Sequence, residues 1–474
     1  MTRDFTKLHR AFNPKSIAIV GDKGTSGFPW IRTLSTFQGN LYSVQTNLEH
    51  AQGIKAMGVE NYHSLLDITE PIDLVIVSVP RAASLQILED CITKGVSAVH
   101  FFTAGFAETG TKEGESLERL LVERAREADI NLIGPNCMGI FNPKIGLRQN
   151  DMQYTGVRGP VGFISQSGTH AGTFAQEGHL HGIDINKSVS FGNGRVLDST
   201  DYLEYFGQDR EIEFIGMYLE GVQDGRKFLE TLRDVAAHKP VVIWKGGQTD
   251  SGARAIASHT GSLAGPDYIW DAAVRQHGAL SVDSLEELID TMNGIIHLSP
   301  VHGDRVALIG GSGGQSVAIA DAFVNAGLRV PLLTKDSNEK LATFFNLVGA
   351  SCLNPIDPGS NRSQMIRITD IVVHDANIDN VVLLAAASLW QHMPDFIQDF
   401  INVASTVSKQ TAKPVMAILP HFSTPDNMKQ VGEIEKELLE IGVPSFYSFE
   451  RGARALSNVL SHYKLRNELL QHHK

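Results

Sequence analysis

The sequence has few cysteines: only Cys91, Cys137 and Cys352 occur among 474 residues, and they are far apart. Such spacing excludes both a disulfide framework and a cysteine-based metal cluster. The sequence also lacks an apolar run near the roughly 18 residues that a membrane span needs. Its first ten residues, MTRDFTKLHR, contain no apolar stretch of the signal-peptide type. We therefore expect a cytoplasmic protein without a membrane partner.

An excess of basic residues is also missing. The chain carries 53 Asp and Glu against 41 Lys and Arg, which gives a formal net charge of −12. This balance argues against a nucleic-acid partner. An anionic substrate would have to be held by backbone amides and a few well-placed cations. With 42% hydrophobic and 20% charged residues, the composition is typical of a folded globular chain, and its length suggests about three units.

Strand-like and helix-like segments alternate along the first third of the chain. The apolar run Ser16–Val20 leads into the glycine-rich segment Gly21–Gly27, and a helical pattern begins near Phe28. A glycine turn between a strand and a helix can bind phosphate groups through backbone N–H groups. The G-x-x-G-x-x-G spacing is not the dinucleotide fingerprint, so a tight turn without a ligand remains an alternative. The alternation predicts a Rossmann-like domain over residues 1–150, with further strands at Asp73–Val79, Val96–Thr103 and Asn131–Ile133.

The rest of the chain repeats one pattern twice. Pro160–Ile164 leads into SQSGT and a helix, and Arg305–Ile309 leads into GGSGG and a helix. In each half, a later strand is entered through Lys-Pro-Val. These features predict two flavodoxin-like, doubly wound α/β domains, over residues 151–300 and 301–474. The first-turn amides of each helix after such a turn would attract a phosphate.

A single histidine, His259, lies among small residues in the segment Ala255–Gly265. The segment follows the strand-like run Pro240–Trp244 and Lys245, and we expect a glycine-rich loop there. A loop at the carboxyl end of a strand is where open α/β sheets bind ligands. On this segment alone, an ordinary exposed histidine is an equally good interpretation.

Several motifs together resemble one family. The motifs, in order along the chain, are GFAETG (105–110), GPNCMGI (134–140), ISQSGT (164–169), YLEGVQDGRKF (218–228), SHTGSLAG (258–265), GGSGG (310–314) and NPID (354–357). On these motifs the chain resembles the CoA-binding, α-type part of the nucleoside-diphosphate-forming acyl-CoA synthetases, within the succinyl-CoA synthetase superfamily. SHTGSLAG together with YLEGV is the specific part of the likeness, which covers nearly the whole chain.

The resemblance implies that His259 is phosphorylated and that Glu220 orients its ring and balances its charge. A nucleophilic imidazole does need an acceptor on its other nitrogen, and a carboxylate also stabilises the cationic phospho-form. The remaining implied contacts fall into three groups. Phosphate binding is implied for Ser167, Gly168, Thr169, Gly313 and Gly314, the acyl-phosphate site for Gly134, Pro135 and Asn136, and coenzyme A binding for Gly21, Gly24, Thr25, Ser26, Gly27, Val79, Pro80, Arg81 and Gly105.

The chain departs from the family pattern in two places. Thr46–Glu49 stands where the family usually has Asn-Pro-Lys, and the first loop, GDKGTSG, differs from the usual Gly-Ala-Ser-rich form. Lys245 and Arg158 are candidate cations for the site, or else solvated surface charges. We expect no metal site on this chain. Because the sequence has no room for the family's ATP-grasp module, we expect ATP or ADP, with Mg, on a β-type partner subunit of a heteromer.

The sequence thus predicts a ligase subunit that interconverts acyl-CoA, phosphate and ADP with a carboxylic acid, coenzyme A and ATP. One alternative is a transferase component that kept the CoA-ligase fold without the ligase cycle. Another is a non-catalytic subunit that binds acyl-CoA. A serine hydrolase is disfavoured because Ser167 lacks the G-x-S-x-G context, and the fingerprint glycines of a nicotinamide dehydrogenase are not in place.

Overall fold

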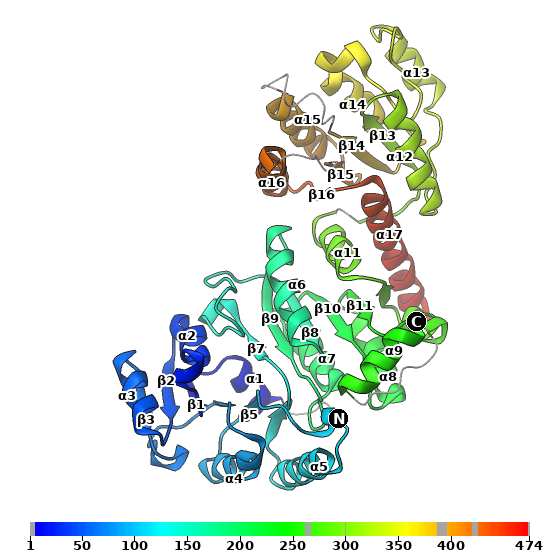
Figure 1. Ribbon diagram of the computed structural model, residues 1–474. Helices are drawn as coiled ribbons and strands as arrows, with labels where there is room; N and C mark the ends of the chain where they lie inside the picture. Colours follow the sequence, from blue (N-terminus) through cyan, green and yellow to red (C-terminus); the bar gives the residue numbers. More distant parts are fainter. Residues whose placement is uncertain (1–4, 261–266, 299, 386–395, 420–424, 473–474) are drawn as a thin grey trace. The chain divides into compact units, whose positions relative to one another are not determined.

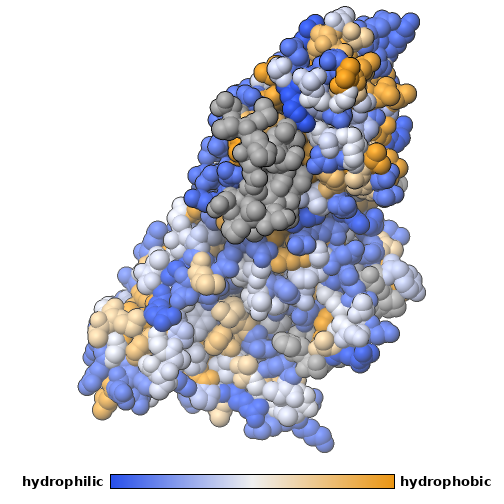
Figure 2. Space-filling model, turned by 45° about the horizontal axis from the view of Figure 1, so that its top comes forward, coloured by the Kyte–Doolittle hydropathy of each residue, from blue (hydrophilic) through white to orange (hydrophobic). Residues whose placement is uncertain are grey.

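The computed structural model describes residues 5–260, 267–298, 300–385, 396–419 and 425–472; within these ranges the side chains of 257–260, 267, 425–428, 470 and 472 are not described. The chain divides into two compact units, residues 1–285 and 286–474. None of the described helices combines the length and the apolar character needed to cross a membrane. On the face seen in Figure 2, hydrophilic residues are widespread and apolar ones are interspersed among them.

The first sheet of unit 1 is parallel and six-stranded (Figure 1). Its strand order is the doubly wound 3-2-1-4-5-6 order of a Rossmann fold, which confirms the predicted fold class. The central strands are buried at every position, as expected for a parallel sheet covered on both faces. In sheet order the strands are β3 (Glu60–Tyr62), β2 (Asn40–Val44), β1 (Ser16–Val20), β4 (Leu74–Val77), β5 (Ala98–Phe101) and β6 (Asn131–Ile133). The helices are α1 (Thr6–Phe12), α2 (Pro29–Thr33), α3 (Leu48–Ala56), α4 (Ser84–Lys94) and α5 (Lys112–Glu127), with 3-10 turns η1 (Gly24–Ser26), η2 (Leu34–Thr36), η3 (Leu65–Asp67), η4 (Arg81–Ala83), η5 (Ala107–Thr109) and η6 (Pro143–Ile145).

The second sheet of unit 1 is also six-stranded. Its parallel part runs β9-β8-β10-β11-β12, the 2-1-3-4-5 order of flavodoxin-like folds, and β7 adds an antiparallel edge beside β9. In sheet order the strands are β12 (Leu280–Val282), β11 (Val241–Lys245), β10 (Phe214–Leu219), β8 (Val161–Ser165), β9 (Ile185–Ser190) and β7 (Gly139–Phe141). The helices are α6 (Gly168–Leu180), α7 (Ser199–Gln208), α8 (Gly225–Ala236), α9 (Asp250–Thr260) and α10 (Asp267–Gln276).

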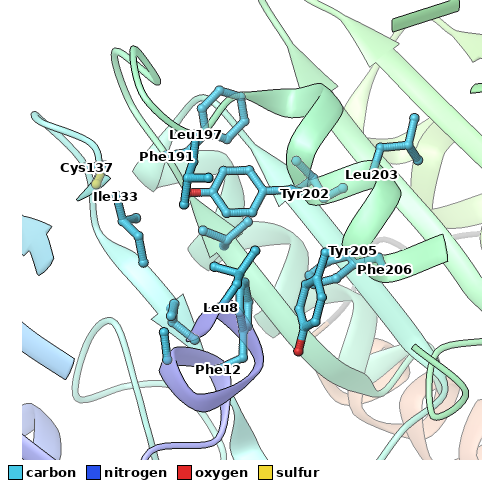
Figure 3. Close-up of a cluster of buried hydrophobic side chains, with 14 of the residues drawn as sticks. Leu8, Phe12, Ile133, Cys137, Phe191, Leu197, Tyr202, Leu203, Tyr205 and Phe206 are labelled. Atoms are coloured by element: carbon cyan, nitrogen blue, oxygen red, sulfur yellow. The ribbon is translucent and has the colours of Figure 1, made fainter. Parts of the chain in front are cut away.

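One hydrophobic core joins the two sheets of unit 1. Helix α1 precedes the first sheet in the chain, yet its Phe12 packs against α7 of the second sheet (Figure 3). The ring centroid of Phe12 lies 5.1 Å from that of Tyr205 and 5.5 Å from that of Phe206. These rings are buried together, so the packing of α1 on α7 joins the two sheets' domains within unit 1.

Unit 2 contains a parallel sheet in the order β13-β14-β15-β16. Beside it, isolated bridges pair Arg305 with Arg329 and Ile309 with Ile356. The unit confirms the second flavodoxin-like fold, whereas the exact division at residues 150 and 300 stays a prediction. The strands are β13 (Val306–Gly310), β14 (Asn380–Leu384), β15 (Val415–Ile418) and β16 (Ser445–Phe446). The helices are α11 (Leu285–His297), α12 (Gly313–Asn325), α13 (Lys335–Ala342), α14 (Met365–Val373), α15 (Phe396–Gln410), α16 (Pro425–Glu440) and α17 (Phe449–His472), with the 3-10 segment η7 (Gly359–Gln364).

A buried histidine in β5 makes the stability of unit 1 depend on pH. The ring of His100 is fully buried and its Nε2–H donates to the carbonyl oxygen of Cys137 at 3.0 Å. Burial lowers the pKa of His100 from 6.5 to about 4. Between these values the unfolded chain binds a proton that the folded chain excludes, so stability falls as the pH falls from 6.5 toward 4. The expected slope is about 1.4 kcal/mol per pH unit.

Hydrogen exchange of the β5 amides at pH 7.5 and 5.0 measures this effect. His100→Gln keeps the N–H donor but does not titrate, so its exchange free energy should lose this slope. Equal pH dependence in the variant and the unmodified chain would contradict the assignment.

Candidate active site

A cavity of about 280 Å³ lies at the carboxyl ends of the strands of unit 1. Its lining comes from the segments that follow β5, β6, β8, β9 and β10, which is where open α/β sheets bind ligands. The structure brings together the predicted residues Asn136, Ser167, Gly168, Thr169 and Glu220 here. The sequence analysis assigned no binding role to the other lining residues, which lie in or next to predicted strands and turns: Phe102, Cys137, Met138, Gln166 and Gly192.

The amino end of helix α6 opens into this cavity. Ser167 caps the helix, because its Oγ accepts the backbone N–H of His170 at 3.3 Å. The N–H of Ser167 itself donates to Ser165 Oγ at 3.1 Å. The next two amides, of Gly168 and Thr169, belong to the first turn and have no acceptor within the helix. An electropositive helix end with free N–H groups is suited to the oxygens of a phosphoryl group.

The carboxylate of Glu220 faces the same cavity from the end of β10. The residue is only 8% exposed, and its Oε1 accepts the hydroxyl of Tyr218 at 3.3 Å. Its Oε2 is buried and has no hydrogen-bond partner in the described part of the chain. Gln166 fixes the backbone, since its Oε1 accepts the N–H groups of Glu220 and Gly221. A buried carboxylate oxygen without a partner is costly, so Glu220 offers an acceptor to an N–H group that enters the cavity.

Lys245 holds the backbone beside Glu220. It ends β11, is 6% exposed, and donates from Nζ to the carbonyl oxygens of Glu220 at 2.8 Å and Gly246 at 2.6 Å. The interpretation of Lys245 as a solvated surface charge is therefore wrong. Arg158 behaves in the opposite way, because its side chain is 54% exposed and pairs with Glu211 at 2.6 Å.

His259 lies in helix α9, which runs through Thr260. The expected glycine-rich loop is therefore helical up to that residue. The physical reason is the alternation of alanine with larger residues over Ala253–Ala257, since alanine is the strongest helix former and outweighs Gly252. The backbone of α9 lies beside η5 of the first sheet's domain. The imidazole of His259, and the segment that follows Thr260 up to Pro266, lie outside the described residues.

A tight turn over Gly134–Asn136 reaches the cavity through Asn136, whereas Gly134 and Pro135 do not line it. Gly134 and Asn136 both have positive φ values, of 100° and 60°. Gly192 packs directly on this turn: a Cβ at Gly192 would overlap the carbonyl oxygens of Pro135 and Asn136. The turn is also tied to the first sheet, because the N–H of Asn136 donates to Thr103 O at 3.1 Å. Its position is therefore set by backbone contacts on both sides.

The segments predicted to bind coenzyme A meet at the carboxyl edge of the first sheet. Gly21 has a φ of 92°, and a Cβ there would lie 2.5 Å from Val79 Cγ1, so the loops after β1 and β4 are in close contact. Arg81, which follows Pro80, donates from Nη1 to Gly105 O at 2.7 Å. The remaining predicted contacts, Gly24, Thr25, Ser26 and Gly27, lie in and directly after η1.

Asp22 occupies the end of the helix that follows the first loop. Helix α2 has five residues and begins at Pro29, which has no N–H. The carboxylate of the buried Asp22 accepts the N–H of Ile31 at 2.9 Å, and burial raises the pKa of this carboxyl group. A carboxylate thus sits where the sequence analysis expected a phosphate, so any phosphate contact in this loop falls to its other residues.

Gly313 and Gly314 form the first turn of α12 in unit 2. Ser312 precedes them as the N-cap residue without a side-chain cap, and its Oγ donates to Gln315 Oε1 at 3.3 Å. A phosphate-binding role for this turn stays a prediction.

Cys137 lines the cavity but is not built to act as a nucleophile. It is buried, and burial raises the pKa of its thiol to about 12. At pH 8 only about one thiol in 10⁴ would be ionised, and the thiolate is the reactive form.

With iodoacetamide on the native protein, we expect the partly exposed Cys352 to be alkylated well before Cys137 and the buried Cys91. Peptide mass spectrometry over time checks the order, and early labelling of Cys137 would contradict it.

Comparisons with known proteins agree with this architecture. Residues 15–143 match a CoA binding domain, and residues 158–295 match the Succinyl-CoA ligase like flavodoxin domain. The chain is 34% identical to the acetate–CoA ligase [ADP-forming] II subunit alpha of Pyrococcus furiosus, over 92% of this chain and 93% of that protein. The chain belongs to the α-subunit type of the ADP-forming acyl-CoA synthetase family.

Two further relatives place this α-type chain within the family. It is 33% identical to acetate–CoA ligase [ADP-forming] I of Archaeoglobus fulgidus over 96% of its own length, but spans only 64% of that longer protein. The dinucleotide forming acetyl-coenzyme A synthetase 1 of Ca. Korarchaeum cryptofilum, solved in complex with phosphate and ADP, superposes with a TM-score of 0.83 at 27% identity, covering 98% of each chain.

Proposed function

We propose that the chain is the α subunit of an acid–thiol ligase that interconverts acyl-CoA, phosphate and ADP with a carboxylic acid, coenzyme A and ATP. One observation carries the proposal. The first-turn amides of Gly168 and Thr169 share one cavity with Oε2 of Glu220, which has no hydrogen-bond partner among the described residues. Such a cavity combines a binding site for phosphoryl oxygens with a buried acceptor for an imidazole N–H.

The chemistry divides into steps that these residues can serve. A phosphate oxygen attacks the thioester carbonyl carbon, the C–S bond breaks, and coenzyme A leaves as the thiol. One imidazole nitrogen of His259 then attacks the phosphorus of the acyl phosphate, and the carboxylic acid leaves as the carboxylate. Finally a terminal oxygen of ADP takes the phosphoryl group, which restores neutral His259 and forms ATP. Splitting a difficult transfer through a covalent intermediate is the general benefit of nucleophilic catalysis.

Each part of the cavity has a role in this scheme. The first turn of α6 holds the phosphoryl oxygens without moving a proton. The turn at Pro135 and Asn136 positions the acyl group of the acyl phosphate. Glu220 accepts the N–H of the non-reacting imidazole nitrogen through Oε2 and offsets the positive charge of the phosphohistidine.

A second subunit would complete the enzyme. The Pyrococcus furiosus relative is named a subunit, and the Archaeoglobus fulgidus relative is longer than this chain. The described residues contain no group of three His, Cys, Asp or Glu side chains that could hold a metal ion. We therefore assign coenzyme A to this chain, and ADP or ATP with Mg to a β-type ATP-grasp subunit. A cytoplasmic location would supply all of these substrates.

The test is ATP formation by the purified complex of the two subunits. With acetyl-CoA and longer acyl-CoA thioesters in parallel, ATP should form only when acyl-CoA, phosphate and ADP are all present. Acyl phosphate release without a need for ADP would instead support a transferase component. Binding of coenzyme A with neither ATP formation nor an acid-labile phosphoenzyme would support a non-catalytic acyl-CoA-binding subunit.

A further inference from the structure

Asn193 lies behind the cavity, in the loop that follows β9. Its backbone N–H donates to the carbonyl oxygen of Pro135 at 3.1 Å, and its Oδ1 accepts the side-chain amide of Asn136 at 3.5 Å. Both contacts are to the turn that reaches the cavity through Asn136. Asn193 is half-buried and does not line the cavity itself.

The side-chain amide of Asn193 reaches two acidic residues of the first sheet's domain. Its Nδ2 donates to Glu108 Oε2 at 2.7 Å and to Glu118 Oε2 at 2.6 Å. Glu118 belongs to α5 and is 3% exposed, and its other oxygen accepts Nε of Arg195 at 3.0 Å. Two carboxylates therefore share the two N–H groups of one neutral amide.

Glu108 extends these hydrogen bonds to the loop that contains Gly105, which is predicted to bind coenzyme A and is called the coenzyme A loop. Its Oε1 accepts the backbone N–H groups of Gly105 at 2.6 Å and Phe106 at 3.1 Å. Glu108 thus binds the loop with one oxygen and Asn193 with the other. One residue, Asn193, thus contacts the turn through its backbone N–H and its Oδ1, and reaches the predicted coenzyme A loop through its side-chain amide and Glu108.

The geometry points to Asn193 as a positioning residue that fixes the coenzyme A loop relative to the turn at Pro135 and Asn136. This role rests on the proposed function, because the two segments would place the thioester carbon of acyl-CoA next to the bound phosphate. A neutral amide is required here: an acidic residue would place a third carboxylate beside Glu108 and Glu118, and an alanine would leave both without their donor. The backbone bond from Asn136 N–H to Thr103 O remains in either variant, so losing the amide removes the side-chain part of the connection and loosens the placement of one segment against the other.

Asn193→Asp is the informative variant, because it keeps the size and Oδ1 but removes the donor. In the two-subunit enzyme we expect kcat/KM for coenzyme A to fall about 100-fold, the loss associated with misplacing reacting groups by about 1 Å. Formation of the phosphoenzyme from labelled ATP involves neither coenzyme A nor the acyl group, so it should fall much less than kcat/KM for coenzyme A. Asn131→Asp is the matched control, since the side chain of Asn131 in β6 also donates, to Ser97 O, without touching the cavity lining, and it should alter neither activity.

A double variant that exchanges donor and acceptor between residues 193 and 118 separates a positioning role from a loss of folded structure. In the double variant Asn193→Asp with Glu118→Gln, the new amide at 118 can donate to the new carboxylate at 193. We expect this pair to recover at least about tenfold of the lost kcat/KM. Unchanged turnover in Asn193→Asp, or equal loss of both half-reactions without recovery in the double variant, would overturn the role. Absence of both activities in the unmodified complex would overturn the proposed function itself, and this role with it.

Discussion

Replacing Glu220 by glutamine is expected to lower kcat by about 10⁴-fold, the loss seen when the acid that orients a catalytic imidazole is neutralised. The substitution keeps the shape of the side chain and the contact with the Tyr218 hydroxyl. It removes the negative charge and places an N–H group where Oε2 should accept one. The phosphohistidine then loses its charge partner, so both its formation and its stability should fall. Steady-state turnover with acyl-CoA, phosphate and ADP measures the loss.

The same substitution should not lower the melting temperature. A buried carboxylate with an unpartnered oxygen costs folding energy, so neutralising it is expected to be neutral or stabilising. Glu213→Gln, at an exposed position just before β10, is the matched control and should alter neither turnover nor melting temperature. Turnover equal to that of the control would show that the charge of Glu220 is not needed for catalysis, and unfolding of Glu220→Gln would show a structural role instead.

Gly192→Ala is expected to reduce turnover by about 100-fold, because the new Cβ must displace the carbonyl oxygens of Pro135 and Asn136. Neither oxygen belongs to a flexible side chain, so the turn that reaches the cavity through Asn136 must move. The positive φ of Gly192, 52°, adds a backbone strain of about 1 kcal/mol. Kinetics and thermal unfolding of the purified variant separate the two effects.

Gly95→Ala provides the control for this strain. Gly95 also has a positive φ, of 71°, but nothing lies within 4 Å of a Cβ at that position. It should therefore lose a similar amount of stability and keep its turnover. Equal turnover in Gly192→Ala and Gly95→Ala would show that this turn does not need its present position.

The sequence allowed the sheets and half of the cavity to be predicted. Continuous apolar runs such as Leu74–Val77 predicted buried parallel strands, because neighbouring helices cover both faces of such a sheet. The roles of Gly168 and Glu220 were implied by the family resemblance, and their places near strand ends fit it, because the carboxyl ends of parallel strands share one edge. The positions of these loops relative to one another depend on tertiary packing, and no sequence pattern indicated them.

Long-range polar contacts were beyond prediction from the sequence. Asn193 meets Glu118 and Pro135 across 75 and 58 residues of chain, and no motif marks any of these three as partners. Gln166 was quoted within a motif, but its contact with the backbone of Glu220 required the folded sheet. At Asp22 the sequence pattern was misleading. The glycines around it predicted a phosphate site at the start of α2, but the Asp22 carboxylate already accepts the N–H of Ile31 there.

The central claim is that His259 carries the phosphoryl group between the acyl phosphate and ADP. It is tested most directly by incubating the two-subunit complex with ATP labelled in its terminal phosphate and locating the label. The account predicts an acid-labile phosphate on His259 that disappears when carboxylic acid and coenzyme A are added, and no label on this chain in His259→Ala. Unchanged incorporation of label in His259→Ala would contradict it.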